Sequence, residues 1–214
     1  MKKNIAIFLS FIFLAFQTAK AEVSVGFTGA LHMFDVSGTE TTRTSGQKNT
    51  GSHSDEVLVP EFFVESQQDN IAVGLAFIPT RDMGSKSRTD SGDQSAGTYK
   101  AAAELENVIQ AYADFTVGQY AGADVYIKAG LQHATIATLE SLNSGSTYPN
   151  QDVFGLTLGL GAKGDLPYEN TYYKVDLTYT DFEDYSADDT AGTGNKVEAD
   201  LEDVALKLSI GYKF

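Results

Sequence analysis

Along several segments, apolar residues alternate with residues that are charged or small, so that lysines and carboxylates fall on one side only. The C-terminal segment shows this most clearly, because Lys207 and Lys213 lie at odd positions while apolar and aromatic residues occupy the even ones. Charged side chains gathered on one face can pair with one another, and charges that are buried must be paired. The same side chains can also line a water-filled pore. The spacing therefore allows two roles, an ion-paired plug or a polar passage.

We expect the charged residues to point into the interior of a closed structure. Both signs occur in nearly equal number, which favours a network of ion pairs and hydrogen bonds over an open pore. The predicted interior network consists of Glu61, Glu65, Asp114, Lys128, Lys174, Asp176, Asp203 and Lys207, with Lys213 as a further inward position.

The histidines give no sign of a metal or catalytic centre. His32, His53 and His133 lack the His-x-x-x-His spacing of a zinc site. The run His133-Ala134-Thr135 matches a histidine–hydroxyl pair only in part, and no third group is placed to orient it. We therefore predict no catalytic residue, no metal ligand and no cofactor, and a lipid-modifying enzyme is the least favoured function.

An acidic segment is the remaining candidate for ion binding. Residues 181–190 carry carboxylates at five positions, a density that suits hard-oxygen ligation of Ca²⁺. The spacing does not match an EF-hand loop. We favour a solvated acidic loop that keeps the exterior hydrated, with divalent-cation binding as the alternative.

The elements that must position these residues are β-strands. Alternation with period two separates two faces, as when Phe154, Leu156, Leu158 and Leu160 fall on one side and glycine and threonine on the other. A short helix over residues 101–113 is an alternative at one point, and a count of ten strands remains open. We expect eight strands near residues 23–36, 56–67, 70–79, 106–118, 122–137, 154–161, 172–179 and 204–214.

The connections between these segments alternate in length. Short turns are expected at residues 67–70, 118–121 and 163–169, and long polar loops at 37–55, 80–105, 138–150 and 181–199. Short turns on one side and long exterior loops on the other are typical of a barrel in a lipid sheet. Lipid offers the backbone no hydrogen-bond partner, so such a sheet must close. We therefore predict an all-β fold, an eight-stranded antiparallel transmembrane β-barrel with up-and-down meander topology.

Aromatic residues are expected to form girdles at the two membrane interfaces. A soluble lipocalin-like protein is the rival fold, and its apolar residues would face inward rather than lipid. We place Tyr120, Tyr168, Tyr212 and Phe214 at the short-turn end, and Phe34, Phe77, Tyr148 and Phe182 at the loop end.

The N-terminal segment predicts export. Basic residues precede a short apolar run and a small-x-small site, the pattern of a secretory signal peptide cleaved after Ala21. Residues 1–21 are thus the predicted signal peptide and residues 22–214 the barrel domain. Removal of residues 1–21 would take three lysines and change the formal net charge from −14 to −17, and such a surface would repel nucleic acid, so we predict no nucleic-acid partner.

The C-terminal residues 206–214 closely resemble the insertion signal of bacterial outer-membrane proteins. The resemblance implies that Leu208, Ile210, Tyr212 and Phe214 are recognised by the barrel-assembly machinery, after periplasmic chaperones have delivered the chain. The whole chain is more loosely similar to small porin-family and opacity-type barrels, which implies a monomer in the lipid of the cell outer membrane. We predict a structural or interaction role, or a narrow passage for small solutes. A surface adhesin or ligand-recognition barrel acting through its long loops is the alternative.

Overall fold

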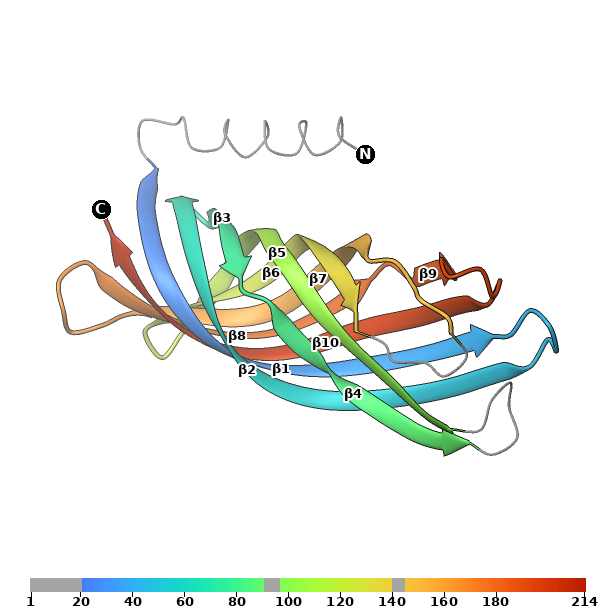
Figure 1. Cartoon of the computed structure of the whole chain (residues 1–214). Coiled ribbons are helices and arrows are strands. Elements are labelled where there is room, and N and C mark those ends of the chain that lie inside the picture. The colour runs from blue at the N-terminus through green and yellow to red at the C-terminus, as the bar shows by residue number, and fades with distance from the viewer. Residues whose placement is uncertain (1–20, 91–96, 140–144) are drawn as a thin grey trace.

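The computed structural model describes residues 21–90, 97–139 and 145–214, and residues 1–20 of the predicted signal peptide lie outside that range. Antiparallel β-strands make up almost all of it (Figure 1). Among the described residues no helix is long and apolar enough to span a membrane. The strands are β1 (Glu22–Thr41), β2 (Lys48–Gln68), β3 (Ile71–Ile78), β4 (Arg81–Asp90), β5 (Gly97–Tyr120), β6 (Ala123–Thr138), β7 (Gln151–Asp165), β8 (Thr171–Phe182), β9 (Tyr185–Asp188) and β10 (Lys196–Lys213).

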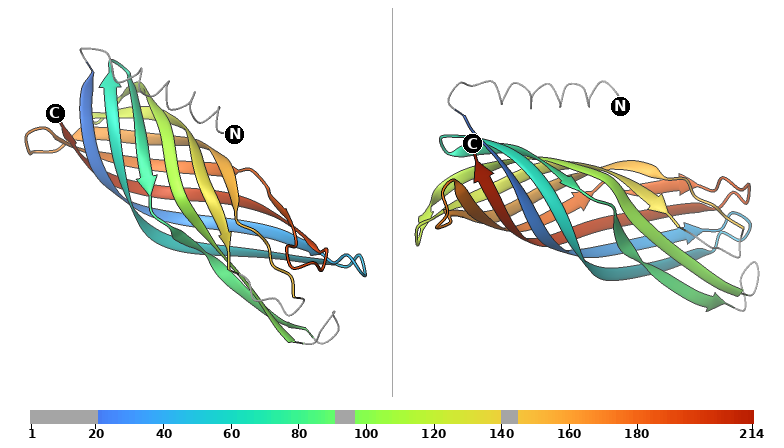
Figure 2. Two further views of the ribbon diagram at one scale, coloured as in Figure 1. Left: turned by 45° about the horizontal axis from the view of Figure 1, so that its top comes forward. Right: turned by 60° about the vertical axis from the view of Figure 1, so that its left-hand side comes forward.

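The sheet closes on itself. Neighbouring strands follow the order β1-β2-β3-β5-β6-β7-β8-β10, and β10 pairs back with β1 from Ser24↔Lys213 to Thr41↔Lys196. Two short strands extend this ring, since β4 follows β3 along β5 and β9 follows β8 along β10. The ten strands therefore occupy eight positions around a barrel (Figure 2). The predicted fold class is confirmed, and the difference between eight and ten strands comes from two interrupted strands.

The apolar face of the sheet lies outside. Leu156, Leu158 and Leu160 on β7 are 59, 54 and 62 % exposed, whereas a dry core would bury them. On β10 the exposed apolar residues Leu208 and Ile210 alternate with buried charged and small residues. The alternative of a soluble barrel with an apolar interior is therefore wrong, because the charged halves of the strands face the axis.

The strands run further than the sequence pattern predicts. The segments 37–55 and 80–105, expected as loops, are mostly the outer parts of two long hairpins, β1–β2 and β4–β5. Within the second of these segments, residues 81–90 and 97–105 are strand, and residues 91–96 lie outside the described residues. The helix considered for residues 101–113 is also wrong, because β5 covers that stretch. Polar and small residues interrupt the alternation on both hairpins, so the period-two pattern does not predict strands there although Met83 and Tyr99 are buried.

Glycines on the inner face accommodate large aromatic rings. A Cβ atom on Gly211 would lie 2.2 Å from Cζ of Tyr172, and one on Gly161 would lie 2.3 Å from Cζ of Tyr126. Both tyrosines are almost fully buried. The rings thus lie against the barrel wall where a glycine leaves room, which fills the narrow interior without widening the ring.

Replacing Gly211 with alanine should lower the free energy of unfolding by about 1–3 kcal/mol, because the added methyl overlaps the Tyr172 ring. Urea unfolding of the refolded protein in lipid vesicles would measure this. Gly29→Ala is the matched control, since a Cβ atom there meets nothing within 4 Å. Equal stability of the two variants would contradict the packing argument.

Candidate functional site

The interior near the short-turn end contains a compact network of ion pairs. Lys174 Nζ lies 2.6 Å from both Glu65 Oε2 and Asp114 Oδ2. Lys128 Nζ lies 3.0 Å from Asp114 Oδ1 and 3.3 Å from Asp176 Oδ1. All five side chains are at most 7 % exposed. Strands β2, β5, β6 and β8 each contribute, so the network ties opposite walls of the barrel together.

Tyrosines and one further lysine complete this network. Tyr112 donates a hydrogen bond to Glu65 at 3.1 Å, and Tyr126 donates one to Asp176 at 2.9 Å. Lys163 Nζ, 3.0 Å from Glu65 Oε1, was not among the predicted residues because the sequence pattern places it in a turn. The layer holds cations, carboxylates and phenols that are paired with one another, and we find it packed rather than open.

A second ion cluster lies nearer the middle of the barrel. Lys207 Nζ donates to both oxygens of Glu61, at 2.8 and 3.0 Å. His32 lies between Asp203 Oδ2, 2.8 Å from its Nδ1, and Glu61 Oε1, 3.0 Å from its Nε2. The Arg81 guanidinium is buried beside them, with Nη2 3.6 Å from Asp203. All eight predicted network residues therefore lie inside the barrel, in two groups.

His32 and Arg81 were missed by the sequence reasoning for different reasons. For His32 the sequence analysis notes only the absence of a zinc-site spacing, although the inward phase of β1, continued from Ala30, brings it to the axis. The predicted exterior loop 80–105 includes Arg81, but the break between β3 and β4 changes the inward phase, so that Arg81 rather than Thr80 faces the axis. Lys213 lies at the rim, partly exposed, 3.0 Å from Asp165.

An apolar layer fills the barrel beyond the second ion cluster. Phe34, Tyr148 and Phe182, predicted for the outer aromatic girdle, are instead buried in this layer at 1, 4 and 4 % exposure. Phe77, assigned to the same girdle, is exposed at 52 %. The girdle assignment is therefore wrong for three of its four loop-end residues, because proximity to a strand end does not decide which face a side chain occupies.

A pocket of about 300 Å³ lies above this apolar layer, at the loop end of the barrel. Strands β1, β2, β4, β5, β6, β9 and β10 all contribute to its wall. Its lining is polar in places, where Glu40 and Asp200 take part. The buried apolar and aromatic side chains that line it are Met83, Tyr99, Ile136, Tyr148, Tyr185 and Leu201.

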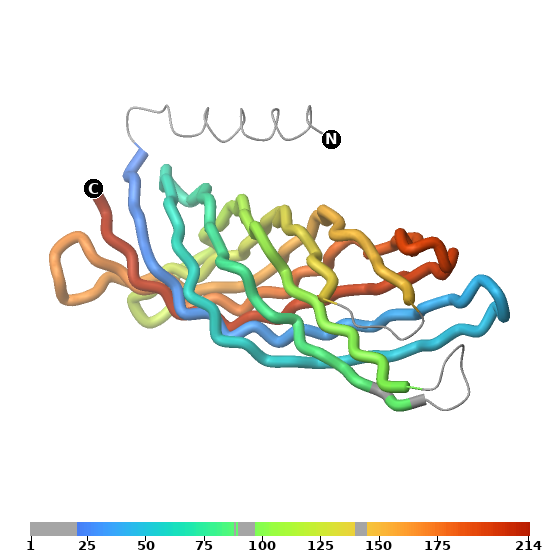
Figure 3. Tube along the Cα trace, in the orientation of Figure 1, coloured from blue at the N-terminus to red at the C-terminus, as the bar shows by residue number. Residues whose placement is uncertain are grey.

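The wall of the barrel is interrupted beside this pocket. The ladder between β2 and β3 ends at Phe62↔Phe77. In the same register the next outward-facing pair is Pro60 and Pro79, neither of which has a backbone N–H to donate. Beyond them no backbone ladder joins the described residues of β2 and β4. Figures 1 and 3 show the β4–β5 hairpin diverging from the β1–β2 hairpin there.

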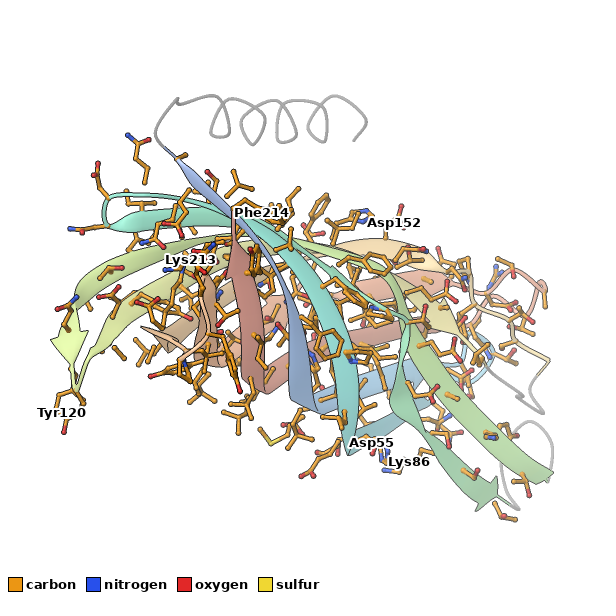
Figure 4. All side chains as sticks on the ribbon, turned by 90° about the vertical axis from the view of Figure 1, so that its left-hand side faces the viewer. Asp55, Lys86, Tyr120, Asp152, Lys213 and Phe214 are labelled. Carbon is orange, nitrogen blue, oxygen red and sulfur yellow. The ribbon has the colours of Figure 1, made fainter. Side chains whose placement is uncertain are left out.

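Side chains bridge the gap between β2 and β4 where the backbone does not. Lys86 Nζ donates a hydrogen bond of 2.7 Å to the carbonyl oxygen of Ser52. A Cβ atom on Gly84 would lie 2.5 Å from the His53 ring and 2.9 Å from Asp55 Oδ2, so these side chains lie against the Gly84 backbone. Figure 4 labels Asp55 and Lys86 at this place. The pocket borders both edges of the gap.

The exterior loops beside the pocket are tied together by buried polar groups. Asn195, fully buried, accepts a hydrogen bond from the Arg43 backbone N–H and donates one to Ser146 Oγ, both at 3.0 Å. Asp189 accepts hydrogen bonds from the backbone N–H groups of Thr147 and Thr193. Desolvation raises the pKa of Asp189, but these hydrogen bonds outweigh it and hold the pKa below its ordinary value of 3.8. Asp189, which belongs to the predicted acidic segment, thus holds two exterior loops together.

Elsewhere in the acidic segment, exposed carboxylates lie close enough to repel one another. Asp184 is exposed, and the charge of nearby Asp200 raises its pKa above the ordinary value. In the described part of the chain no three histidine, cysteine, aspartate or glutamate side chains are grouped so as to hold a metal ion. The histidine–hydroxyl pair is not formed either, since Thr135 donates to Asp152 and His133 packs against Phe154.

The predicted assembly-signal residues lie together on the outer face of the last strand. Leu208, Ile210, Tyr212 and Phe214 are 60, 62, 44 and 76 % exposed, and the last two rings are 5.2 Å apart. They form a continuous apolar stripe at the point where β10 meets β1.

A closed antiparallel ring with an apolar outside and an ion-paired inside is the fold of small outer-membrane β-barrels. Among solved structures, the chain is similar to the outer membrane protein OprG from Pseudomonas aeruginosa, with a TM-score of 0.64 and 19 % identity over 91 % of this chain and 97 % of that one. Outer membrane protein AlkL (TM-score 0.47, 13 % identity, covering 91 % and 90 %) and Neisserial surface protein A (0.44, 9 %, covering 88 % and 97 %) also match. No family model and no curated protein matches the chain.

Proposed function

We propose that the protein binds a small, mostly apolar molecule in its loop-end pocket and releases it sideways, through the gap between β2 and β4, into the membrane. The observation that carries this proposal is the coincidence of the two features. A pocket of about 300 Å³ with buried apolar side chains borders the upper part of the gap, where the described residues of β2 and β4 form no backbone ladder.

The filled interior favours a sideways route over a straight one. Below the pocket lie the apolar layer and then two ion clusters, whose members are almost all buried and paired. An apolar molecule moving along the axis would have to separate those pairs, and breaking one buried pair costs about 3–5 kcal/mol. This argues against the narrow aqueous passage that the sequence left open.

The outer surface around the lower end of the gap favours release into lipid. Leu58, Phe62 and Phe77 flank the point where β2 and β3 separate, and all three point outward at 74, 53 and 52 % exposure. A molecule leaving there would pass from the pocket to acyl chains without crossing water, which is the favourable direction for apolar surface. The polar upper part of the gap would serve as its entrance.

We infer that the protein is exported and lies in the outer membrane. Location in the outer membrane is supported by the fold likeness and by the apolar exterior, and export by the N-terminal pattern. We further propose that the chain is a monomer without enzymatic activity, inserted by the barrel-assembly machinery through its C-terminal stripe. Cell fractionation with heat-modifiable migration on gels would test this location.

The pocket is tested by filling it. Ala199 lies on the inner face of β10 and lines the pocket, so Ala199→Phe should reduce the uptake of radiolabelled naphthalene by Gram-negative cells that express the protein. We expect a reduction of about tenfold, equivalent to about 1.4 kcal/mol of lost binding. The matched control is Glu198→Phe, one residue away on the outer face. Equal uptake by Ala199→Phe and the parent protein would contradict the proposal.

A further inference from the structure

The rim of the gap has a different chemistry from the pocket behind it. On the β4 side Lys86 is exposed and extends across the gap, and on the β2 side the carbonyl of Ser52 accepts its hydrogen bond at 2.7 Å. His53 and Asp55 lie just below, against the backbone of Gly84. A molecule that enters the pocket from outside through the gap therefore meets a polar contact before it reaches apolar side chains.

A bulge in the backbone of β4 positions Lys86 for its hydrogen bond to Ser52. Gly84 has a φ of +94°, in the left-handed region that favours glycine, and the register against β5 shifts between Asp82 and Ser85. This bulge brings Gly84 against the side chains of β2 and places Lys86 two residues later, at the level of Ser52. The contact is thus built by local backbone geometry on β4.

Entry of a molecule between the two strands must separate Lys86 from Ser52. The lysine ammonium carries three donors and no acceptor, so it needs an oxygen or other acceptor to replace the carbonyl. A hydrocarbon offers none. A molecule with a carbonyl or hydroxyl oxygen can accept the hydrogen bond from Lys86 while its apolar part moves into the pocket. The free-energy cost of separating Lys86 from Ser52 is therefore lower for such a molecule.

The charges around the gap favour neutral acceptors over anions. Asp55 lies beside Gly84 at the rim, and Glu40 and Asp200 line the pocket. A ligand carboxylate would approach these three acidic side chains, and among the described residues that line the pocket Lys86 is the one lysine or arginine, so like charges would repel in a partly desolvated site. A ketone or alcohol oxygen accepts from Lys86 without that repulsion.

We propose that Lys86 determines the specificity of the pocket, selecting small apolar molecules that carry one neutral, hydrogen-bond-accepting oxygen over hydrocarbons of the same size. This inference rests on the proposed function, and it names the substrate class that the pocket admits.

The test compares two probes of nearly equal shape, 2-acetylnaphthalene and 2-ethylnaphthalene, in uptake by expressing cells. The parent protein should take up the ketone about threefold faster, a modest ratio because the Lys86 contact is exposed. Lys86→Met should bring the ratio to about one by raising uptake of the hydrocarbon. Lys100→Met, on the neighbouring strand and outside the pocket lining, should keep the parent ratio.

The outcomes separate this inference from the proposed function. An unchanged ratio in Lys86→Met, with uptake of both probes still reduced by Ala199→Phe, would overturn the role of Lys86 alone. Uptake of both probes that does not respond to Ala199→Phe would overturn the pocket itself, and the inference with it.

Discussion

Replacing Lys174 with methionine should lower the free energy of unfolding by about 3 kcal/mol, the low end of the range for breaking a buried ion pair. Lys174 lies 2.6 Å from both Glu65 and Asp114, and its side chain is 3 % exposed. Its removal leaves two buried carboxylates short of a counter-charge. The loss is limited because Lys163 remains beside Glu65 and Lys128 beside Asp114.

Urea titration of the protein refolded in lipid vesicles would measure the effect of Lys174→Met. The control is Lys196→Met, which breaks a pair with Glu198 of the same 2.6 Å length whose side chains are 47 and 58 % exposed. An exposed pair contributes about 0–1 kcal/mol, so this variant should be nearly neutral. If the two variants lost the same stability, the interior network would be solvated rather than buried, and a water-filled lumen would regain support.

The second large effect is expected from closing the gap between β2 and β4. Because the chain contains no cysteine, Ser52→Cys and Lys86→Cys introduce a unique pair of thiols, one on each edge. A short bifunctional linker joining them should reduce naphthalene uptake to the level of cells without the protein, since the sideways route is blocked. Cleavage of a reducible linker should restore uptake.

The control for the linker joins two strands that are already paired. Asp181 and Glu202 are direct partners in the β8–β10 ladder and neither lines the pocket, so Asp181→Cys with Glu202→Cys carries the same linker away from both the gap and the pocket. Uptake through this protein should be unaffected. Uptake that continued with the gap linked would show that the molecule takes another path, and would contradict the sideways route.

The sequence by itself determined the class of fold and the division between inside and outside. Strict alternation in β7 and β10 separates leucine and isoleucine from lysine, aspartate and glycine, and a closed ring in lipid follows because no backbone group can remain unpaired there. The eight predicted charged residues lie inside the barrel for this reason. The alternation of side chains between the two faces is a property of each single strand, so it can be predicted from that strand's sequence alone.

Only the tertiary structure decided where the candidate site lies. The outer parts of β1, β2, β4 and β5 do not alternate regularly between apolar and polar residues, so the pattern predicts loops there although Met83 and Tyr99 are buried inside the barrel. The left-handed Asn107, together with a register shift in β5, changes which side chains face inward. Arg81 and the pocket lining depend on that change of phase.

The gap depends on two residues far apart in the chain. Pro60 and Pro79 are unremarkable singly, and each is compatible with a strand whose N–H faces away from a partner. Only the register of β2 against β3 sets them opposite each other, at the end of the Phe62↔Phe77 ladder. Register is a property of two paired strands and not of either strand alone. The position of the gap therefore cannot be predicted from the sequence pattern of a single strand.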